Sequence, residues 1–168
     1  MKKDIFDRPK IIEGRAWLMI KDHIDTTLIY PEKYLAINDF NEIGQYTFND
    51  LKGYEKIAQL VFPGDILITG ESFGCGTFDQ HAIDCFVSLG IQAIIAKSFC
   101  ETYENQAIKA GFPVMTYVDL DNLRLENWDK IRINFIKGII TNLRNNRTTK
   151  INPFSDHQME IYLQGGDY

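Results

Sequence analysis

The sequence contains few cysteines, and their spacing excludes most of the structures that cysteine builds. Cys75, Cys85 and Cys100 are odd in number and widely spaced, so neither a disulfide framework nor a Cys-x-x-Cys metal site can be read from them. An iron-sulfur cluster needs three or four converging thiolates, so we expect this chain to bind neither a cluster nor another metal. We expect Cys85 to lie in the core and Cys75 to have a packing role.

Long apolar runs and an excess of positive charge are also missing. No run approaches the roughly 20 residues of a membrane span, and residues 1–9 lack the apolar region of a secretory signal. The chain carries 18 Lys and Arg against 23 Asp and Glu, a net charge of -5, which argues against nucleic acid as the main partner. We therefore expect a cytoplasmic protein that acts on small molecules, with no membrane or nucleic-acid partner.

The pattern that is present is that of a single α/β domain spanning residues 1–168. The composition is 45% hydrophobic, which is enough for one well-buried core. Periodicity predicts strands at 11–20, 65–69, 92–96 and 113–118, a polar loop at 22–31, short helical pieces and loops at 32–59, and helices at 78–89 and 98–110. This alternation predicts a mainly parallel sheet flanked by helices.

After residue 118 the pattern changes. Alternation of polar and apolar residues predicts three short strands, at 130–135, 138–142 and 147–151. Such closely spaced strands are typical of an antiparallel meander. A final helix is predicted at 153–163.

The most informative stretch is a buried strand that feeds a glycine-rich loop, Gly70-Glu-Ser-Phe-Gly-Cys-Gly-Thr77, and then the helix at 78–89. Glycines such as Gly74 and Gly76 allow backbone angles that other residues resist. This arrangement aims free N–H groups and the positive end of a helix dipole at one point, which suits an anionic ligand. Tight strand-to-helix turns also need glycine for purely steric reasons, so both interpretations stay open.

Both predicted helices carry signals at their ends. The starts have the spacing of a capping box, at Thr77 and Gln80 and again at Ser98 and Glu101. A glycine follows each helix as a C-terminal stop, at Gly90 and at Gly111.

Further motifs lie on both sides of the loop. They are Gly14-Arg-Ala-Trp, Asp22-His-Ile-Asp-Thr-Thr, Lys33-Tyr-Leu, His81-Ala, Gly90-Ile-Gln-Ala, Ser98-Phe and Gly111-Phe-Pro. Together with the loop, and in this order and spacing, they closely resemble the small subunits of 3-isopropylmalate dehydratase, relatives of the swivelling C-terminal domain of aconitase. The resemblance covers about residues 12–117 and implies a swivelling β/β/α domain.

The resemblance also implies a reaction and a partner. In this family a separate, larger subunit carries a 4Fe-4S cluster, and the small subunit closes over it to complete the active site. The implied reaction is the dehydration and rehydration of a small hydroxy acid in leucine biosynthesis. We therefore expect a heterodimer or heterotetramer in which this chain is inactive alone.

Individual residues take implied roles as well. Thr77 falls on the family's first serine, the catalytic base in the aconitase relatives, and keeps a hydroxyl; the alternative is that Thr77 only caps its helix. The implied substrate-binding residues are Asp25, Thr26, Thr27, Gly74, Cys75, Gly76 and Asp79. Asx and Thr side chains also stabilise turns by themselves, which is the alternative for residues 25–27.

The chain departs from the family at several polar positions near the expected site, among them Thr27, Asp79 and the pair Asn105-Gln106. Asp79 stands where the family has an arginine that holds a substrate carboxylate, so the charge is reversed. Two interpretations follow: an altered hydroxy-acid substrate, or a non-catalytic binding or regulatory module that retained the scaffold. A carboxylate in a first helical turn also favours the helix dipole, which alone explains Asp79.

Residues around this position complete the expected site. We expect His81 to make a structural hydrogen bond. Ile37, Phe40 and Ile43 offer an apolar wall, and Lys109 is the nearest positive charge that aligns with the family.

Overall fold

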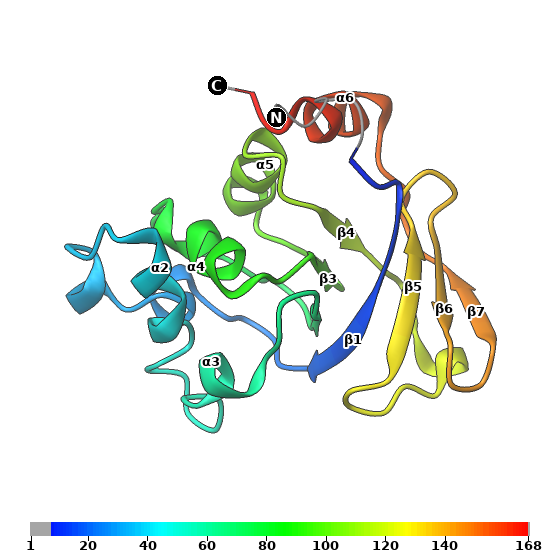
Figure 1. Cartoon of the computed structure of the whole chain (residues 1–168), viewed down its shortest axis with the longest axis horizontal. Coiled ribbons are helices and arrows are strands. Elements are labelled where there is room, and N and C mark those ends of the chain that lie inside the picture. Colours follow the sequence, from blue (N-terminus) through cyan, green and yellow to red (C-terminus); the bar gives the residue numbers. More distant parts are fainter. Residues whose placement is uncertain (1–7, 168) are drawn as a thin grey trace.

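The computed structural model describes residues 8–167, in which seven strands form one curled sheet (Figure 1). The expected lack of a secretory signal rests largely on residues outside this range. The sheet order is β4-β3-β2-β1-β5-β6-β7. The strands are β1 (Ile11–Met19), β2 (Ile66–Thr69), β3 (Ala93–Ala96), β4 (Val114–Thr116), β5 (Lys130–Asn134), β6 (Ile139–Asn142) and β7 (Arg147–Lys150). Pairing is parallel from β4 to β1 and antiparallel from β1 to β7.

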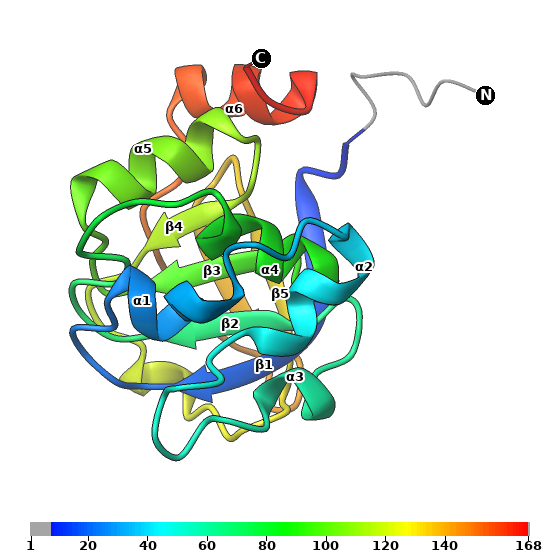
Figure 2. The same ribbon diagram turned by 90° about the vertical axis from the view of Figure 1, so that its left-hand side faces the viewer.

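The parallel half is buried on both faces. Every residue of β2 and β3 is buried, as expected for apolar strands that have cover on both sides. Helices α4 (His81–Leu89) and α5 (Glu101–Lys109) connect β2, β3 and β4 in turn and cover one face of this half (Figure 2). The predicted α/β architecture with helices flanking the sheet is confirmed.

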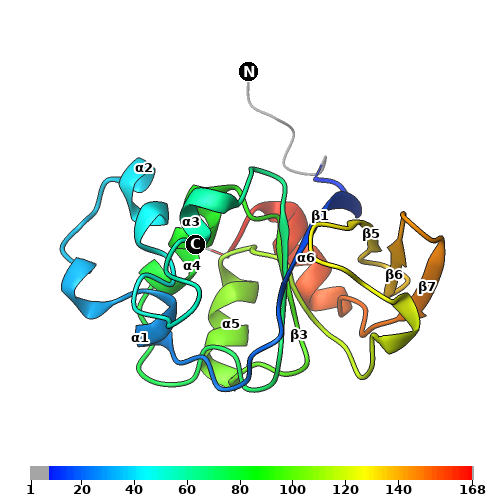
Figure 3. The ribbon, with the colours of Figure 1, turned by 90° about the horizontal axis from the view of Figure 1, so that it is seen from below.

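The antiparallel half curls under the other face of the parallel half. β5 and β6 alternate buried and exposed residues, so their apolar side chains form one face. That face meets the parallel strands in a second core cluster, which includes Ile68, Ile95, Ile131 and Phe135. Figure 3 shows α4 and α5 on one side of β1 and the meander β5–β7 on the other.

The C-terminal helix α6 (Asp156–Gln164) closes the end of this second core. Its N-cap is Ser155, whose side chain accepts a hydrogen bond from the Gln158 amide. Phe154 stacks on Phe135, with 4.4 Å between ring centroids. The expected final helix is therefore present, although it begins three residues later than its sequence suggests.

Short helices occupy the segment between β1 and β2, as expected. They are α1 (Thr26–Ile29), η1 (Glu32–Tyr34), α2 (Phe40–Ile43), η2 (Gly44–Tyr46) and α3 (Ile57–Leu60), and a sixth, η3 (Asp121–Leu123), follows β4. The polar loop predicted at 22–31 is wrong in part, because α1 lies within it. No helix among residues 8–167 has the length and apolar character needed to cross a membrane.

Both predicted capping boxes are wrong. α4 begins at His81 rather than at residue 78, and the Gln80 side chain binds Asp84 instead of closing a box. At α5, the Ser98 hydroxyl accepts from the Ser72 amide, so it is engaged by the neighbouring loop. A tertiary contact thus took the Ser98 hydroxyl that the local spacing assigned to a cap, whereas at α4 the competing contact of Gln80 lies within the helix. The predicted stops are confirmed, since Gly90 and Gly111 have φ of 77° and 71°.

Candidate active site

Three loops meet where the parallel strands β1, β2 and β3 end (Figure 2). The loop after β2 is the middle one. On one side the Gly74 amide donates to the Ile24 carbonyl and the Thr26 amide donates to the Cys75 carbonyl, both at 2.8 Å. On the other side the Cys100 amide donates to the Phe73 carbonyl at 2.9 Å. Parallel strands bring their carboxyl ends to one edge, which is where open α/β sheets bind ligands.

Two glycines shape the loop for different reasons. Gly74 has φ of 85°, and a Cβ there would collide with the side chain of Tyr103, which is completely buried. Gly76 has φ of 98°, and a Cβ there would lie 3.2 Å from the Thr26 hydroxyl oxygen. Both angles belong to the left-handed region that favours glycine. The steric explanation for a glycine therefore applies at both positions.

The loop leaves a run of backbone donors open. The N–H groups of Gly74 and His81 are bound within the chain, to the Ile24 carbonyl and the Asp79 carboxylate. Between them, the N–H groups of residues 75–80 have no acceptor among residues 8–167. Gly76 and Thr77 are exposed. A group of unpaired N–H donors just before the nine-residue helix α4 can receive an anion.

Thr77 presents its hydroxyl to solvent. Its carbonyl accepts a 2.7 Å hydrogen bond from the hydroxyl of Thr26, which is buried and so fixes the backbone of Thr77. Within residues 8–167 the Thr77 hydroxyl itself has no hydrogen-bond partner. Capping is therefore excluded as its role in this structure. Asp25 and Thr27 are exposed on either side of Thr26, at the start of α1.

Asp79 is bound to His81 rather than left free. Its Oδ1 accepts from the His81 amide at 2.8 Å and lies 2.6 Å from the ring nitrogen Nδ1. The other ring nitrogen, Nε2, lies 2.8 Å from the Ile37 carbonyl. Both ring nitrogens face acceptors, and only the doubly protonated imidazolium donates to both. The expected structural hydrogen bond of His81 is present, and it joins the imidazole to both Asp79 and the Ile37 carbonyl.

Other expected neighbours are not brought together. Ile43 is buried in the core, whereas Phe40 is 48% exposed on α2, so the predicted apolar wall is wrong. Lys109 ends α5, and the start of that helix contacts the loop, so Lys109 lies at the opposite edge of the sheet. Tyr30 stacks on His81 with 5.1 Å between ring centroids, and burial raises the pKa of Tyr30 to about 12. Tyr30 therefore stays protonated at neutral pH.

The cysteine prediction is wrong in one respect and confirmed in another. Cys75 and Cys100 form a disulfide, with 5.1 Å between their Cα atoms. No local pattern indicates this bond, because the two cysteines, 25 residues apart, come into contact only when the loops after β2 and β3 pair. Cys85 lies in the core as expected, and burial raises the pKa of its thiol to about 12.

Among the described residues the glycine-rich loop holds no metal site, and a neighbouring cavity reaches only its first residues, Gly70 and Glu71. Among residues 8–167 no three His, Cys, Asp or Glu side chains converge on a metal site, and two of the three thiols are paired, so these residues do not fit an iron-sulfur cluster. A cavity of about 830 Å³ opens at the same edge of the sheet, and its lining includes Gly70, Lys97 and Tyr117. Residues 74–79 line none of it.

Comparisons with known proteins agree on one family. A model of the aconitase C-terminal domain matches residues 24–119. The 3-isopropylmalate dehydratase small subunit 1 of Archaeoglobus fulgidus is 36% identical, over 91% of this chain and 92% of that protein. The small subunit of Caldicellulosiruptor saccharolyticus is 34% identical, over 93% and 88%. A crystal structure of 3-isopropylmalate dehydratase from Methanocaldococcus jannaschii superimposes with a TM-score of 0.83 and 31% identity, over 93% of this chain and 90% of the other.

Proposed function

Because this chain belongs to the family of 3-isopropylmalate dehydratase small subunits, a family of hydro-lyases with an aconitase C-terminal domain, we propose that it completes a hydro-lyase active site with a larger subunit. The observation that carries this proposal is the run of open N–H groups at residues 75–80. These donors lie on an exposed loop rather than in a cavity of this chain. An anion bound there would be covered only when a second chain closes over it.

The substrate proposed is a small hydroxy acid. One of its carboxylates would bind the N–H groups that precede α4, where the helix dipole adds to their attraction. A 4Fe-4S cluster in the larger subunit would supply a Lewis acid for the leaving hydroxyl. This chain would contribute Thr77, whose exposed hydroxyl lies next to the open N–H groups and takes the carbon-bound proton once activated.

The identity of the acid depends on Asp79. A substrate carboxylate 4 Å from an unpaired Asp79 would be destabilised by about 4 kcal/mol at intermediate dielectric. Asp79 is in contact with His81, whose ring nitrogen lies 2.6 Å from the carboxylate oxygen Oδ1. This contact offers no free positive charge that could bind a substrate carboxylate in place of the family's arginine. We therefore infer a hydroxy acid with one fewer carboxylate at this point, or a basic residue from the larger subunit.

The test is reconstitution with the larger subunit of the same organism in the cytoplasm of an expression host, the compartment we propose for the native complex. We expect the two chains to purify together as a brown, cluster-bearing heteromer that is active on a hydroxy acid. Thr77→Val should lower turnover by about 10²-fold or more, and Thr77→Ser should retain most of it. Equal turnover by Thr77→Val and the wild type would show that the Thr77 hydroxyl takes no part in catalysis.

The charge reversal also supports a second candidate, a binding or regulatory module without catalysis. The two candidates differ in the response to Asp79→Arg in the reconstituted complex. If Asp79 sets the substrate, this variant should gain isopropylmalate turnover while the wild type prefers another acid. If the module is non-catalytic, the complex forms and neither version turns over any hydroxy acid. Efficient wild-type isopropylmalate turnover that falls in Asp79→Arg, with no compensating cation, would refute the electrostatic argument.

A further inference from the structure

Cys75 and Cys100 join the loop that carries the open N–H groups to the loop after β3. Cys75 is the first residue of the open run, and Cys100 immediately precedes α5. Their Cα atoms are 5.1 Å apart, inside the range that a disulfide requires without backbone movement. The two sulfurs are therefore in place to bond or to separate while the surrounding fold stays as it is.

The fold does not depend on this bond. The two loops are already paired through the backbone, since the Phe73 amide donates to the Ser98 carbonyl and the Cys100 amide donates to the Phe73 carbonyl. The Ser72 amide also donates to the Ser98 hydroxyl. Among the described residues these hydrogen bonds between the two loops end at Phe73, so the disulfide is what links Cys75 to the loop after β3.

The backbone on both sides of Cys75 is glycine. Gly74 and Gly76 have φ of 85° and 98°, and glycine can leave such angles more readily than other residues. Without the disulfide, Cys75 is held by its carbonyl, which accepts from the Thr26 amide, and by its sulfur, which lies 3.5 Å from the Ser72 carbonyl oxygen. With the disulfide, its side chain is anchored to α5 as well. Bonding therefore restricts the turn that presents the open N–H groups.

The pair is accessible to a small reagent. Cys75 and Cys100 are both partly exposed, whereas Cys85 is completely buried. In reducing compartments, disulfides are rare and tend to be transient or redox-sensing. A partly exposed pair that the fold does not need matches this reversible class rather than the structural one.

We propose that Cys75 and Cys100 are a redox modification site, whose reversible disulfide fixes the anion-receiving turn. In the forward direction one thiolate attacks a low-molecular-weight disulfide and releases one thiol. The second thiolate then attacks the mixed disulfide and releases the other thiol. Overall, two protein thiols and one small disulfide give one protein disulfide and two small thiols. A small dithiol reverses the reaction. This site stands independently of the reaction proposed above.

The experiment uses the full chain and glutathione disulfide as the oxidant, with dithiothreitol as the reductant. Peptide mass mapping should find the Cys75 to Cys100 cross-link after oxidation and its complete loss after reduction, without unfolding. Hydrogen exchange at the amides of residues 75–80 should slow several-fold in the oxidised form. Exchange at the buried strands β2 and β3 should be the same in both forms.

Three variants separate the outcomes. Cys75→Ser and Cys100→Ser should each abolish both the cross-link and the redox dependence of exchange. Cys85→Ala is the matched control and should leave both intact. The proposal is refuted if the oxidised wild type lacks the cross-link, if the cross-link resists dithiothreitol in the folded chain, or if exchange at residues 75–80 is the same in both forms. Two separate serine variants are tested, so that the conclusion still holds if one of them does not fold.

Discussion

Gly74 and Gly76 share a positive φ, yet their side-chain surroundings differ. A Cβ at Gly74 would collide with the side chain of the buried Tyr103. A Cβ at Gly76 would lie 3.2 Å from the Thr26 hydroxyl oxygen. Gly53 offers a reference, because its φ is 89° and nothing lies within 4 Å of a Cβ built there. Backbone strain and steric collision can therefore be separated within one chain.

Replacing each of these glycines by alanine should give a graded loss of stability. Gly53→Ala should cost about 1 kcal/mol, the strain of a left-handed angle alone. Gly76→Ala should cost about 1–2 kcal/mol, and the β-branched Gly76→Val about 1–3 kcal/mol. Gly74→Ala should cost more than about 3 kcal/mol, because Tyr103 cannot move aside. Urea unfolding measures all four, and equal losses at Gly53 and Gly74 would refute the collision.

Asp79 contributes to stability through the two groups that it binds. Asp79→Ala should cost about 1 kcal/mol, because it removes the acceptor for the His81 amide and the partner of the imidazole. Asp79→Asn keeps an acceptor and should cost less. The side chain of Asp79 is 47% exposed, so solvent screening keeps the charge contribution small. Thermal or urea unfolding of both variants provides the measurement. An alanine variant as stable as the wild type would contradict this assignment.

At the scale of single elements, the helix starts show how local signals were overridden. α4 begins after a turn that Asp79 closes, and the Thr77 hydroxyl takes no part. α6 begins with a true side-chain cap at Ser155. The two hydroxyls therefore provide a matched pair, one of which caps a helix while the other is free for chemistry.

Removing these two hydroxyls should have different effects on stability. Ser155→Ala should cost about 1 kcal/mol, as expected for the loss of an N-cap. Thr77→Ala should change the free energy of unfolding by less than about 0.5 kcal/mol, while activity of the reconstituted complex falls. A Thr77→Ala loss as large as that of Ser155→Ala would restore the capping interpretation.

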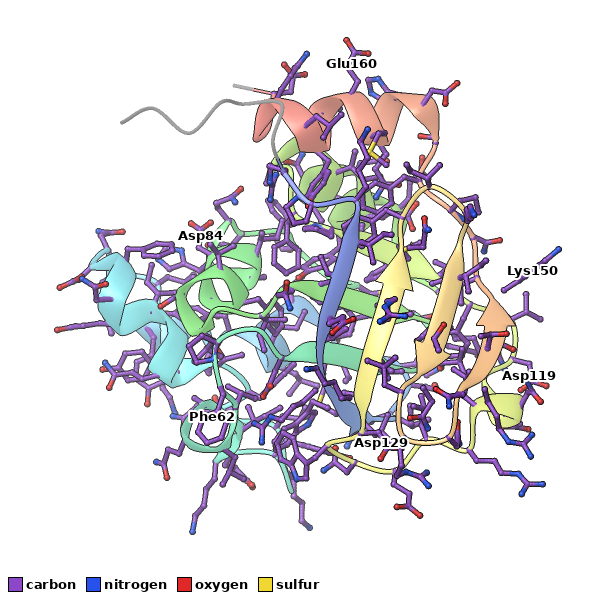
Figure 4. All side chains as sticks on the ribbon, turned by 45° about the vertical axis from the view of Figure 1, so that its right-hand side comes forward. Phe62, Asp84, Asp119, Asp129, Lys150 and Glu160 are labelled. Atoms are coloured by element: carbon purple, nitrogen blue, oxygen red, sulfur yellow. A yellow bond between two sulfur atoms is a disulfide. The ribbon has the colours of Figure 1, made fainter. Side chains whose placement is uncertain are left out.

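The start of the antiparallel half depends on one buried carboxylate. Asp129 precedes β5 (Figure 4) and accepts hydrogen bonds from Arg144, the Glu126 amide and Asn142. Burial raises the pKa of Asp129, but these hydrogen bonds outweigh it and the net pKa lies below the usual carboxyl range. Asp129 thus links the loop before β5 to the turn after β6.

This carboxylate should make stability depend on pH in the acid range. Because the folded pKa is the lower one, its contribution is complete above the unfolded value of about 3.9. It is lost as the pH falls from there through the folded pKa. Urea unfolding of the wild type and of Asp129→Asn should therefore give a difference that shrinks with acidification below about pH 4. A constant difference between pH 7 and pH 3 would contradict the assignment.

At the scale of the whole molecule, the curled sheet joins two cores on opposite faces of its parallel half. One core lies beneath α4 and α5, and the other lies between the parallel strands and the meander. The loops at the carboxyl edge are held by both halves of this frame, because β1 belongs to each. The position of the site is therefore set by packing across the entire chain.

The redox state of the cysteine pair should change global stability. A disulfide across 25 residues lowers the entropy of the unfolded chain, so the oxidised protein should be about 3 kcal/mol more stable than the reduced protein. Urea unfolding with and without dithiothreitol measures the difference. Cys75→Ser should remove it, whereas Cys85→Ala should retain it.

The periodicity of the sequence determined most of the secondary structure. Continuous apolar runs become β2 and β3, alternating residues become β5 and β6, and Gly90 and Gly111 end their helices where expected. Such patterns are decided locally, by which residues must face a core. Because ordered motifs span residues 12–117, the sequence also identified the family, the glycine-rich loop and the candidate residues Thr77 and Asp79.

Contacts between distant residues decided the rest. The capping box at α5 failed because the Ser98 hydroxyl accepts from the distant Ser72 amide, whereas the one at α4 failed for a local reason, since Asp79 closes the turn before that helix. The pairing of Cys75 with Cys100 likewise requires loops that meet only in the folded chain, and so does the contact of His81 Nε2 with the Ile37 carbonyl. The spacing of polar residues along the sequence indicates which groups are able to interact. Only tertiary packing decides which partner each polar group takes, because a donor or acceptor used at a long-range contact is no longer free for a local one.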